Sequence, residues 1–149
     1  MVEEVQNFRN LGYTIGGSII FPSKKIDGKM TINGARGFNI KIADRFDLTL
    51  ECIRLHYLGR PNPLDKTLKV NSNFFDLFHS FSGFVDFFLL QDLVTPDYAQ
   101  INFFTDIEIA FDNSPLPQSL EEYSTYMQRN IDFLNARNRR VAQFAIESD

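Results

Sequence analysis

The sequence contains no tryptophan and only one cysteine, and the shortage of cysteine limits the chemistry open to it. With Cys52 alone, no disulfide can form within the chain and no zinc site can be built from cysteines. Cys52 lies in an apolar run, where a free cysteine usually behaves as a small buried hydrophobe. The two histidines, His56 and His79, lack zinc-ligand spacing. We therefore expect no metal site.

Apolar runs long enough to cross a bilayer are also missing, since none approaches the roughly 20 residues required. Residues 1–5 are acidic and lack the basic-then-apolar order of a signal peptide. The sequence has no P-loop ending, no dinucleotide-binding fingerprint and no Gly-x-Ser-x-Gly elbow. We expect a cytoplasmic protein without membrane contact, and the cofactor, if there is one, is unknown.

Positive charge is absent from a long central stretch. Residues 70–128 contain nine Asp or Glu and no Lys or Arg, whereas residues 1–69 contain eleven Lys or Arg against seven acids. The net charge of −4 argues against general DNA binding. The basic parts could form a surface that attracts small anions. Attraction between the basic and acidic parts during folding explains the same pattern at least as well.

The length of 149 residues and the 44% hydrophobic content are typical of one globular domain, which we assign to residues 1–149. Sixteen phenylalanines predict a core in which Phe packs on Phe. Strands are predicted from a β-branched run at 13–21, a hairpin around Asp27-Gly28, and alternating segments at 100–104 and 106–111.

Helices are predicted after Asn39 as far as Tyr57, within 74–81, and from Leu120 to about Ile146 behind the capping-box pattern at 119–122. Residues 84–94 form either a buried helix or a buried strand, because periodicity alone does not separate the two. The predicted fold class is α+β. A single compact domain holds a small, mostly antiparallel sheet packed with a central buried helix and a long C-terminal helix.

The helix predicted over residues 44–57 carries two apolar arcs with a charged stripe between them, formed by Asp44, Asp47, Glu51 and Arg54. A helix with two apolar arcs is sandwiched between neighbours, which places the stripe in a crevice. We therefore predict Asp47 and Glu51 as catalytic or hydrogen-bonding carboxylates. The alternative is a structural ion-pair network in which Arg54 pairs with Glu51 at three-residue spacing.

The segment from Asn33 to Asn39 is predicted to link a strand to the start of this helix. Its glycines let the backbone approach a ligand, and Arg36 provides a fork suited to phosphate or carboxylate. An ordinary tight connection accounts for the segment about as well. The predicted ligand-binding residues are Arg9, Asn10, Asn33, Arg36, Asn39, Arg45 and Arg54.

Several long stretches resemble an uncharacterised domain-of-unknown-function family (number six-nine-nine-four) of short bacterial and phage proteins. The stretches are 7–10, 13–17, 26–37, 44–57 and 84–94. The resemblance covers nearly the whole chain and implies a single domain, but it implies no catalytic residues. For a phage source it implies a role in phage–host conflict, such as capture of a nucleotide signal.

Three functions are consistent with these patterns. The leading hypothesis is binding of a small anionic molecule, for example a nucleotide. The second is a small enzyme acting on a phosphodiester or glycosidic bond through Asp47 or Glu51. The third is a protein-interaction module with exposed Phe and no pocket. A homo-oligomer formed through the C-terminal helix, with Asn138 bonding across a helix pair, is a further expectation.

Overall fold

A computed structural model describes residues 3, 6, 17, 19–22, 31–106 and 111–148. The chain divides into two compact units. The α3 unit comprises residues 20–87 and 107–116, and the α7 unit comprises residues 1–19, 88–106 and 117–149. Each unit is described by itself below, and the assignment of one domain to residues 1–149 stays a prediction.

The described residues are helical and contain no strand, so the prediction of an α+β fold with an antiparallel sheet is wrong. Extended pairing within them amounts to one antiparallel bridge between Val94 and Ile101. The segment at 100–104 therefore forms a bridge rather than a strand. Most of the other predicted strand residues, at 13–21, 23–30 and 107–110, lie outside the described residues.

The first described helix, α2 (Ile32–Phe38), occupies the segment predicted as a glycine-rich connection. Thr31 is its N-cap, because the Thr31 Oγ1 atom accepts a hydrogen bond of 3.1 Å from the Gly34 N–H. Ile32 and Ala35 are buried on one side of the helix. A cap and an apolar pair three residues apart outweigh the roughly 1 kcal/mol by which each glycine disfavours a helix.

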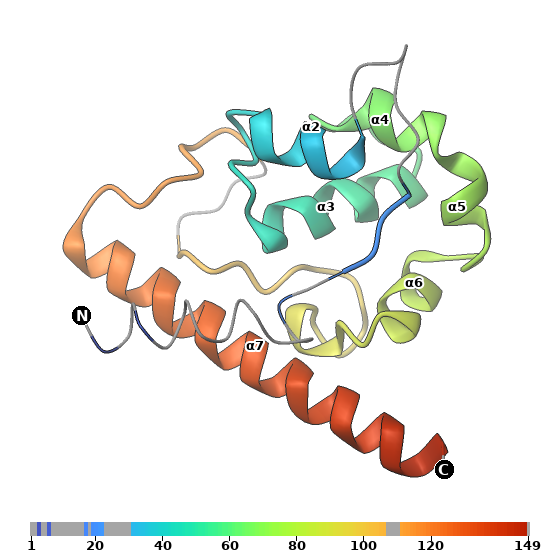
Figure 1. The fold of residues 1–149 in the computed structure, drawn as a ribbon. Coiled ribbons are helices and arrows are strands. Elements are labelled where there is room, and N and C mark those ends of the chain that lie inside the picture. The colour runs from blue at the N-terminus through green and yellow to red at the C-terminus, as the bar shows by residue number, and fades with distance from the viewer. Residues whose placement is uncertain are drawn as a thin grey trace. The chain divides into compact units, whose positions relative to one another are not determined.

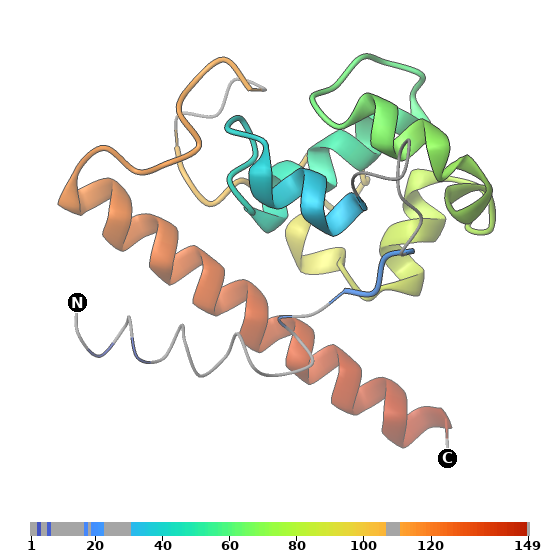
Figure 2. The same ribbon diagram turned by 45° about the horizontal axis from the view of Figure 1, so that its top comes forward.

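Helix α3 (Phe46–Tyr57) is central to its unit, packing against α4 (Asp65–Val70) and α6 (Phe81–Phe87), while α2 also packs against α4 (Figures 1 and 2). It begins later than predicted, because Ala43 and Asp44 adopt left-handed φ angles of 48° and 62°. Its end is as predicted: Gly59 has φ +69°, and the N–H groups of Gly59 and Arg60 bond the carbonyls of His56 and Leu55.

Aromatic side chains fill much of the core of the α3 unit, as the Phe-rich composition predicted. Phe75, at the end of α5 (Ser72–Asp76), and Phe84 are fully buried, with ring centroids 5.8 Å apart. The hydroxyl of Tyr57 donates a hydrogen bond of 2.6 Å to the Phe75 carbonyl. Helix α6 begins at Phe81, so Gly83 lies inside this helix and does not end one.

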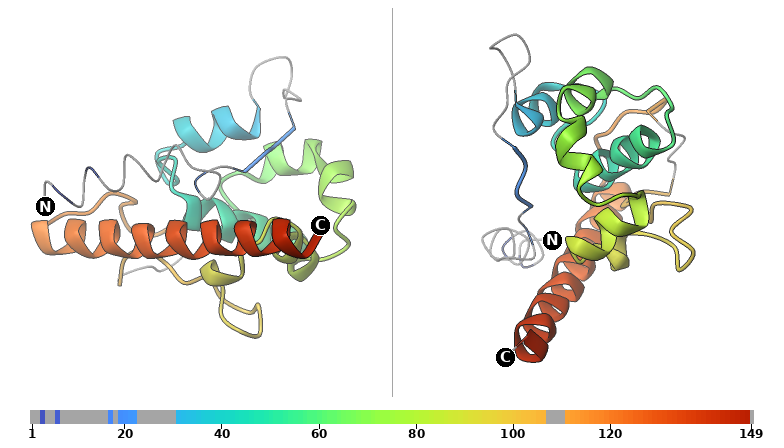
Figure 3. Two further views of the ribbon diagram at one scale, coloured as in Figure 1. Left: turned by 60° about the horizontal axis from the view of Figure 1, so that its bottom comes forward. Right: turned by 90° about the vertical axis from the view of Figure 1, so that its right-hand side faces the viewer.

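The α7 unit contains η2 (Gln91–Leu93), which packs against the long helix α7 (Leu120–Ser148). Figure 3 shows α7 as one uninterrupted coil. Ser119 caps it through a hydrogen bond of 3.1 Å from the Glu122 N–H to Ser119 Oγ, as the capping-box pattern predicted. Residues 84–94 prove to contain the second half of α6 and then η2, rather than one helix or strand.

Candidate functional site

The predicted catalytic carboxylate Asp47 is fully buried and hydrogen-bonded to its neighbours on α3. Arg45, which is 3% exposed, donates from Nε to Asp47 Oδ1 over 3.0 Å and from Nη2 to Asp47 Oδ2. Asp47 Oδ1 also accepts the Leu48 N–H at 2.9 Å. This bidentate arrangement pairs the carboxylate with a guanidinium inside the unit.

Glu51, one turn further along α3, faces Arg54 in a second bidentate pair. Arg54 donates from Nε and Nη2 to the two Glu51 oxygens, both at 2.8 Å. These hydrogen bonds raise the pKa of the Arg54 guanidinium, which stays charged. This is the pair at three-residue spacing that a structural ion-pair network requires.

Arg36 lies on α2 and reaches the turn that precedes α3. Its Nη1 donates to Asp44 Oδ1 at 2.6 Å, its Nη2 to the Asp44 carbonyl at 3.0 Å, and its Nε to Thr49 Oγ1 at 2.9 Å. Two bonds from one guanidinium thereby hold the left-handed conformation at Asp44, and the third ties the same side chain to Thr49 on α3. Arg36 therefore shapes the connection between α2 and α3.

Arg45 makes a second, long-range contact in addition to its pair with Asp47. Its Nη1 donates a hydrogen bond of 2.8 Å to the carbonyl of Pro115. This bond attaches residues 111–116 to the start of α3, although the two segments are separated by some 70 positions in the sequence. The segment that it anchors includes Phe111, whose φ of 70° is unusual for a bulky side chain.

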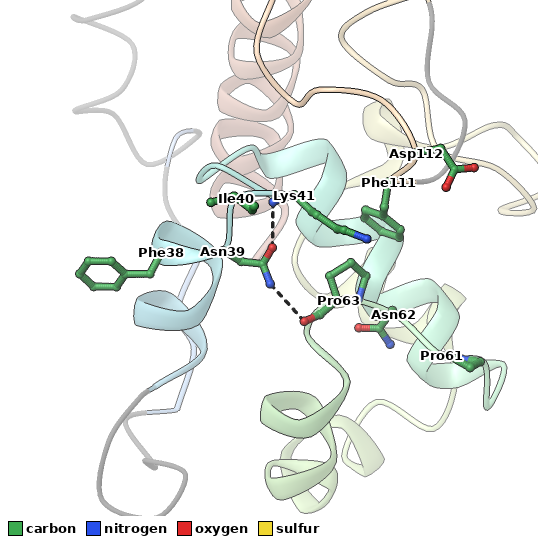
Figure 4. A pocket seen from close by; sticks show the side chains of 9 residues that line it. All are labelled: Phe38, Asn39, Ile40, Lys41, Pro61, Asn62, Pro63, Phe111 and Asp112. Carbon is green, nitrogen blue, oxygen red and sulfur yellow. Dashed lines mark hydrogen bonds between the residues drawn. The ribbon is translucent and has the colours of Figure 1, made fainter.

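Asn39, the C-cap of α2, links the turn after α2 to the loop before α4. Its Nδ2 donates to the Pro63 carbonyl at 3.3 Å, and its Oδ1 accepts the Lys41 N–H at 2.9 Å (Figure 4). The two bonds hold residues 39–41 beside residues 61–63.

A hollow of about 670 Å³ lies where these two segments meet residues 111 and 112. Its volume falls within the range of about 300–1,000 Å³ typical of small-molecule sites. It is open on one side, and Phe38 points away from the other labelled side chains in Figure 4. The lining residues are Phe38, Asn39, Ile40, Lys41, Pro61, Asn62, Pro63, Phe111 and Asp112.

The lining of the hollow carries one positive and one negative side chain, Lys41 and Asp112. Both are exposed, and within the described ranges neither has a hydrogen-bond or ion-pair partner for its charged group. Asn62 Oδ1 accepts the Leu64 N–H at 2.9 Å, whereas Asn62 Nδ2 meets only the Arg60 carbonyl at 3.5 Å. An ammonium group and an amide N–H are therefore available to a ligand here.

The predicted ligand-binding residues are not brought together by the structure. Arg9 and Asn10 lie outside the described residues, and Asn33 is exposed on α2. Arg36, Arg45 and Arg54 bond protein groups, which leaves Asn39 as the predicted residue that lines the hollow. Sequence reasoning missed Lys41, Asn62, Phe111 and Asp112, because no local pattern relates segments so far apart in the chain.

The model of a family of unknown function (DUF6994) matches residues 1–141. The chain belongs to this family. No curated protein and no solved structure matches it. Membership of the family therefore adds no residue role to the geometry above.

Two further features bear on the site. Among the helices of the described ranges, none has the length and hydropathy needed to cross a membrane. In the same part of the chain, no three His, Cys, Asp or Glu side chains are grouped in a way that could hold a metal ion.

Proposed function

We propose that the protein binds a small anionic molecule in the hollow between residues 38–41, 61–63 and 111–112. The observation that carries this proposal is the Lys41 ammonium, exposed in a ligand-sized space without a partner among the described residues. A cation held beside amide donors attracts a carboxylate or phosphate, since charge-assisted hydrogen bonds are the stronger kind. The Asn62 amide supplies such a donor.

The hydrogen bonds around the hollow support the proposal, because a binding site needs walls that keep their shape. Asn39 joins two of the three lining segments, and Arg45 anchors the third through Pro115. Arg45, expected to touch the ligand, therefore acts on the hollow through Pro115. A cytoplasmic location, which the single cysteine favours, is part of the same proposal.

Binding is better supported than catalysis or a flat interaction surface. Asp47 and Glu51 are buried, held by Arg45 and Arg54, and neither lines the hollow. A catalytic carboxylate needs hydrogen-bond reach of the substrate. The interaction hypothesis assumed a surface without a pocket, which the hollow argues against.

Isothermal titration calorimetry with inorganic phosphate, citrate and ribose 5-phosphate tests the proposal. Lys41→Ala should weaken binding by at least about tenfold, because a charged hydrogen bond contributes roughly 1.5–3 kcal/mol. Lys66→Ala is the matched control, since Lys66 is also exposed but does not line the hollow. Equal affinity in the two variants, or no binding of any of these anions, would contradict the proposal.

A further inference from the structure

We infer that the ligand is a nucleoside monophosphate whose base stacks on Phe111 while its phosphate meets Lys41. This inference rests on the proposed anion-binding function and specifies the class of ligand. Two aromatic residues line the hollow, Phe38 and Phe111. The inference starts from Phe111, because Phe38 points away from the other labelled side chains whereas Phe111 lies with Lys41 and Asn62 (Figure 4).

Phe111 is held in a conformation that its side chain does not favour. A φ of 70° is costly for a bulky residue and persists only where the surroundings impose it. Such residues concentrate at ligand sites. The Arg45 bond to the Pro115 carbonyl fixes the backbone four residues further on, and the buried Asp47 fixes Arg45 in turn. The backbone segment that carries Phe111 is therefore anchored at Pro115 before a ligand arrives, which lowers the entropic cost of binding.

The charges of the lining residues favour a ligand with one phosphate group over a ligand with three. Among the described residues that line the hollow, Lys41 is the one cation, and Asp112 directly follows Phe111 in the sequence. A carboxylate beside the ring repels additional anionic groups but accepts hydrogen bonds from hydroxyl groups. A ribose offers such hydroxyls between the phosphate and the base.

The remaining lining suits the sugar and base rather than a second charge. The rings of Pro61 and Pro63 are apolar, and the Asn62 amide can bond the edge of a base. A polynucleotide fits less well, because residues 70–128 carry nine acids and no Lys or Arg. The chemistry therefore matches a free mononucleotide.

The test compares four probes by isothermal titration calorimetry: AMP, ribose 5-phosphate, adenosine and a short single-stranded oligodeoxyadenylate. AMP should bind about tenfold more tightly than ribose 5-phosphate, the increment expected for stacking one base. Phe111→Leu should remove this increment and leave the affinity for ribose 5-phosphate unchanged. Phe111→Tyr keeps a ring and should restore it. Phe144→Leu, at an exposed Phe on α7, is the control.

Several outcomes would overturn the inference. Equal affinities for AMP and ribose 5-phosphate would remove the stacked base while leaving anion binding in place. A loss of ribose 5-phosphate binding in Phe111→Leu, with Phe111→Tyr equally defective, would make the ring structural. Tighter binding of the oligonucleotide would replace the mononucleotide with a nucleic acid. Failure of both phosphate compounds to bind would instead contradict the proposed function itself.

Discussion

At the scale of single residues, the arginines of α2 and α3 bond the protein's own carboxylates and carbonyls. Arg36 and Arg45 each reach a backbone carbonyl as well as an aspartate, at Asp44 and Asp47 respectively. A guanidinium presents five donors in a rigid plane, so one side chain can fix several backbone positions at once. Lysine has no such fork. The Lys41 ammonium has no partner among the described residues and stays available to a ligand.

The Arg45–Asp47 pair should be among the most sensitive positions to substitution. Both side chains are almost fully buried, with exposures of 3% and 0%. Asp47→Ala would remove the carboxylate that receives two Arg45 donors and should lower the free energy of unfolding by about 3–5 kcal/mol. Urea denaturation followed by circular dichroism measures the change.

Asp65→Ala is the matched control for this prediction. Asp65 pairs with Lys69 at 2.8 Å, but the Lys69 side chain is 68% exposed. An exposed pair contributes little, so the loss should stay below about 1 kcal/mol. Similar losses for the two aspartates would show that burial does not set the strength of these pairs.

His56 gives stability a pH dependence with a defined sign. Partial burial against Phe75, whose ring centroid is 5.1 Å away, lowers the pKa of His56 below its usual 6.5, although Asp65 and Asp76 oppose this effect. The unfolded chain then binds the proton more tightly, so stability should be retained above pH 6.5 and fall as the pH drops below it. Unfolding titrations between pH 7.5 and 5.5 measure this slope.

His56→Gln should flatten that part of the pH profile, because glutamine does not titrate. His79→Asn, which changes an exposed histidine, should leave the slope in place. If the slope survives in His56→Gln, the titration belongs to another group.

At the scale of elements, the corner between α5 and α6 depends on one glycine. A Cβ atom added to Gly83 would lie 2.0 Å from the carbonyl oxygen of Phe78, a backbone atom that cannot move aside easily. The Gly83 N–H also bonds Ser80 Oγ at 3.0 Å, which caps α6. The close approach of the two backbones therefore requires glycine at this position.

Gly83→Ala should destabilise the protein by about 2 kcal/mol or more, because overpacking forces the backbone apart. Gly37→Ala provides the contrast. Gly37 is inside α2 with no atom within 4 Å of the added Cβ, so alanine should stabilise by up to about 1 kcal/mol. Thermal melting of the two variants should shift in opposite directions, and shifts of the same sign would refute this account.

At the scale of the whole molecule, the last turns of α7 contribute little to the described core. Side chains from Ala142 to Glu147 are exposed, including Phe144 at 60% and Ile146 at 69%. The buried part of the helix lies earlier, at Met127, Ile131 and Leu134. The apolar side chains of α7 are therefore buried only over its middle, since Leu120 near its start is also 78% exposed.

Removal of residues 141–149 should change the free energy of unfolding by less than about 0.5 kcal/mol, because few buried groups are lost. Ile131→Ala, at a position 6% exposed, should cost about 2–5 kcal/mol and serves as the comparison. A large loss on truncation would mean that these turns are covered in solution. Light scattering would then show whether a second copy covers them, as the predicted homo-oligomer requires.

Features set by near neighbours were predictable from the sequence. Three such features depend only on residues within one or two turns. They are the start of α7 at Leu120, its cap at Ser119, and the end of α3 just before Gly59. The Phe-rich core followed from composition. The prediction that residues 33–39 form a connection was wrong. The N-cap of this helix is Thr31, which precedes the segment, so the glycines within it outweighed the helix signal.

The sequence by itself determined the end of α3, the start of α7, the aromatic core, the family and the charge that each segment carries. Only the tertiary structure decided which of those charges meet. Arg45 reaches Pro115, and Lys41 shares a hollow with Asn62 and Phe111, across separations that no periodic pattern records. The physical reason is that a long side chain selects its partner by position in space, and that position exists only after the helices have packed.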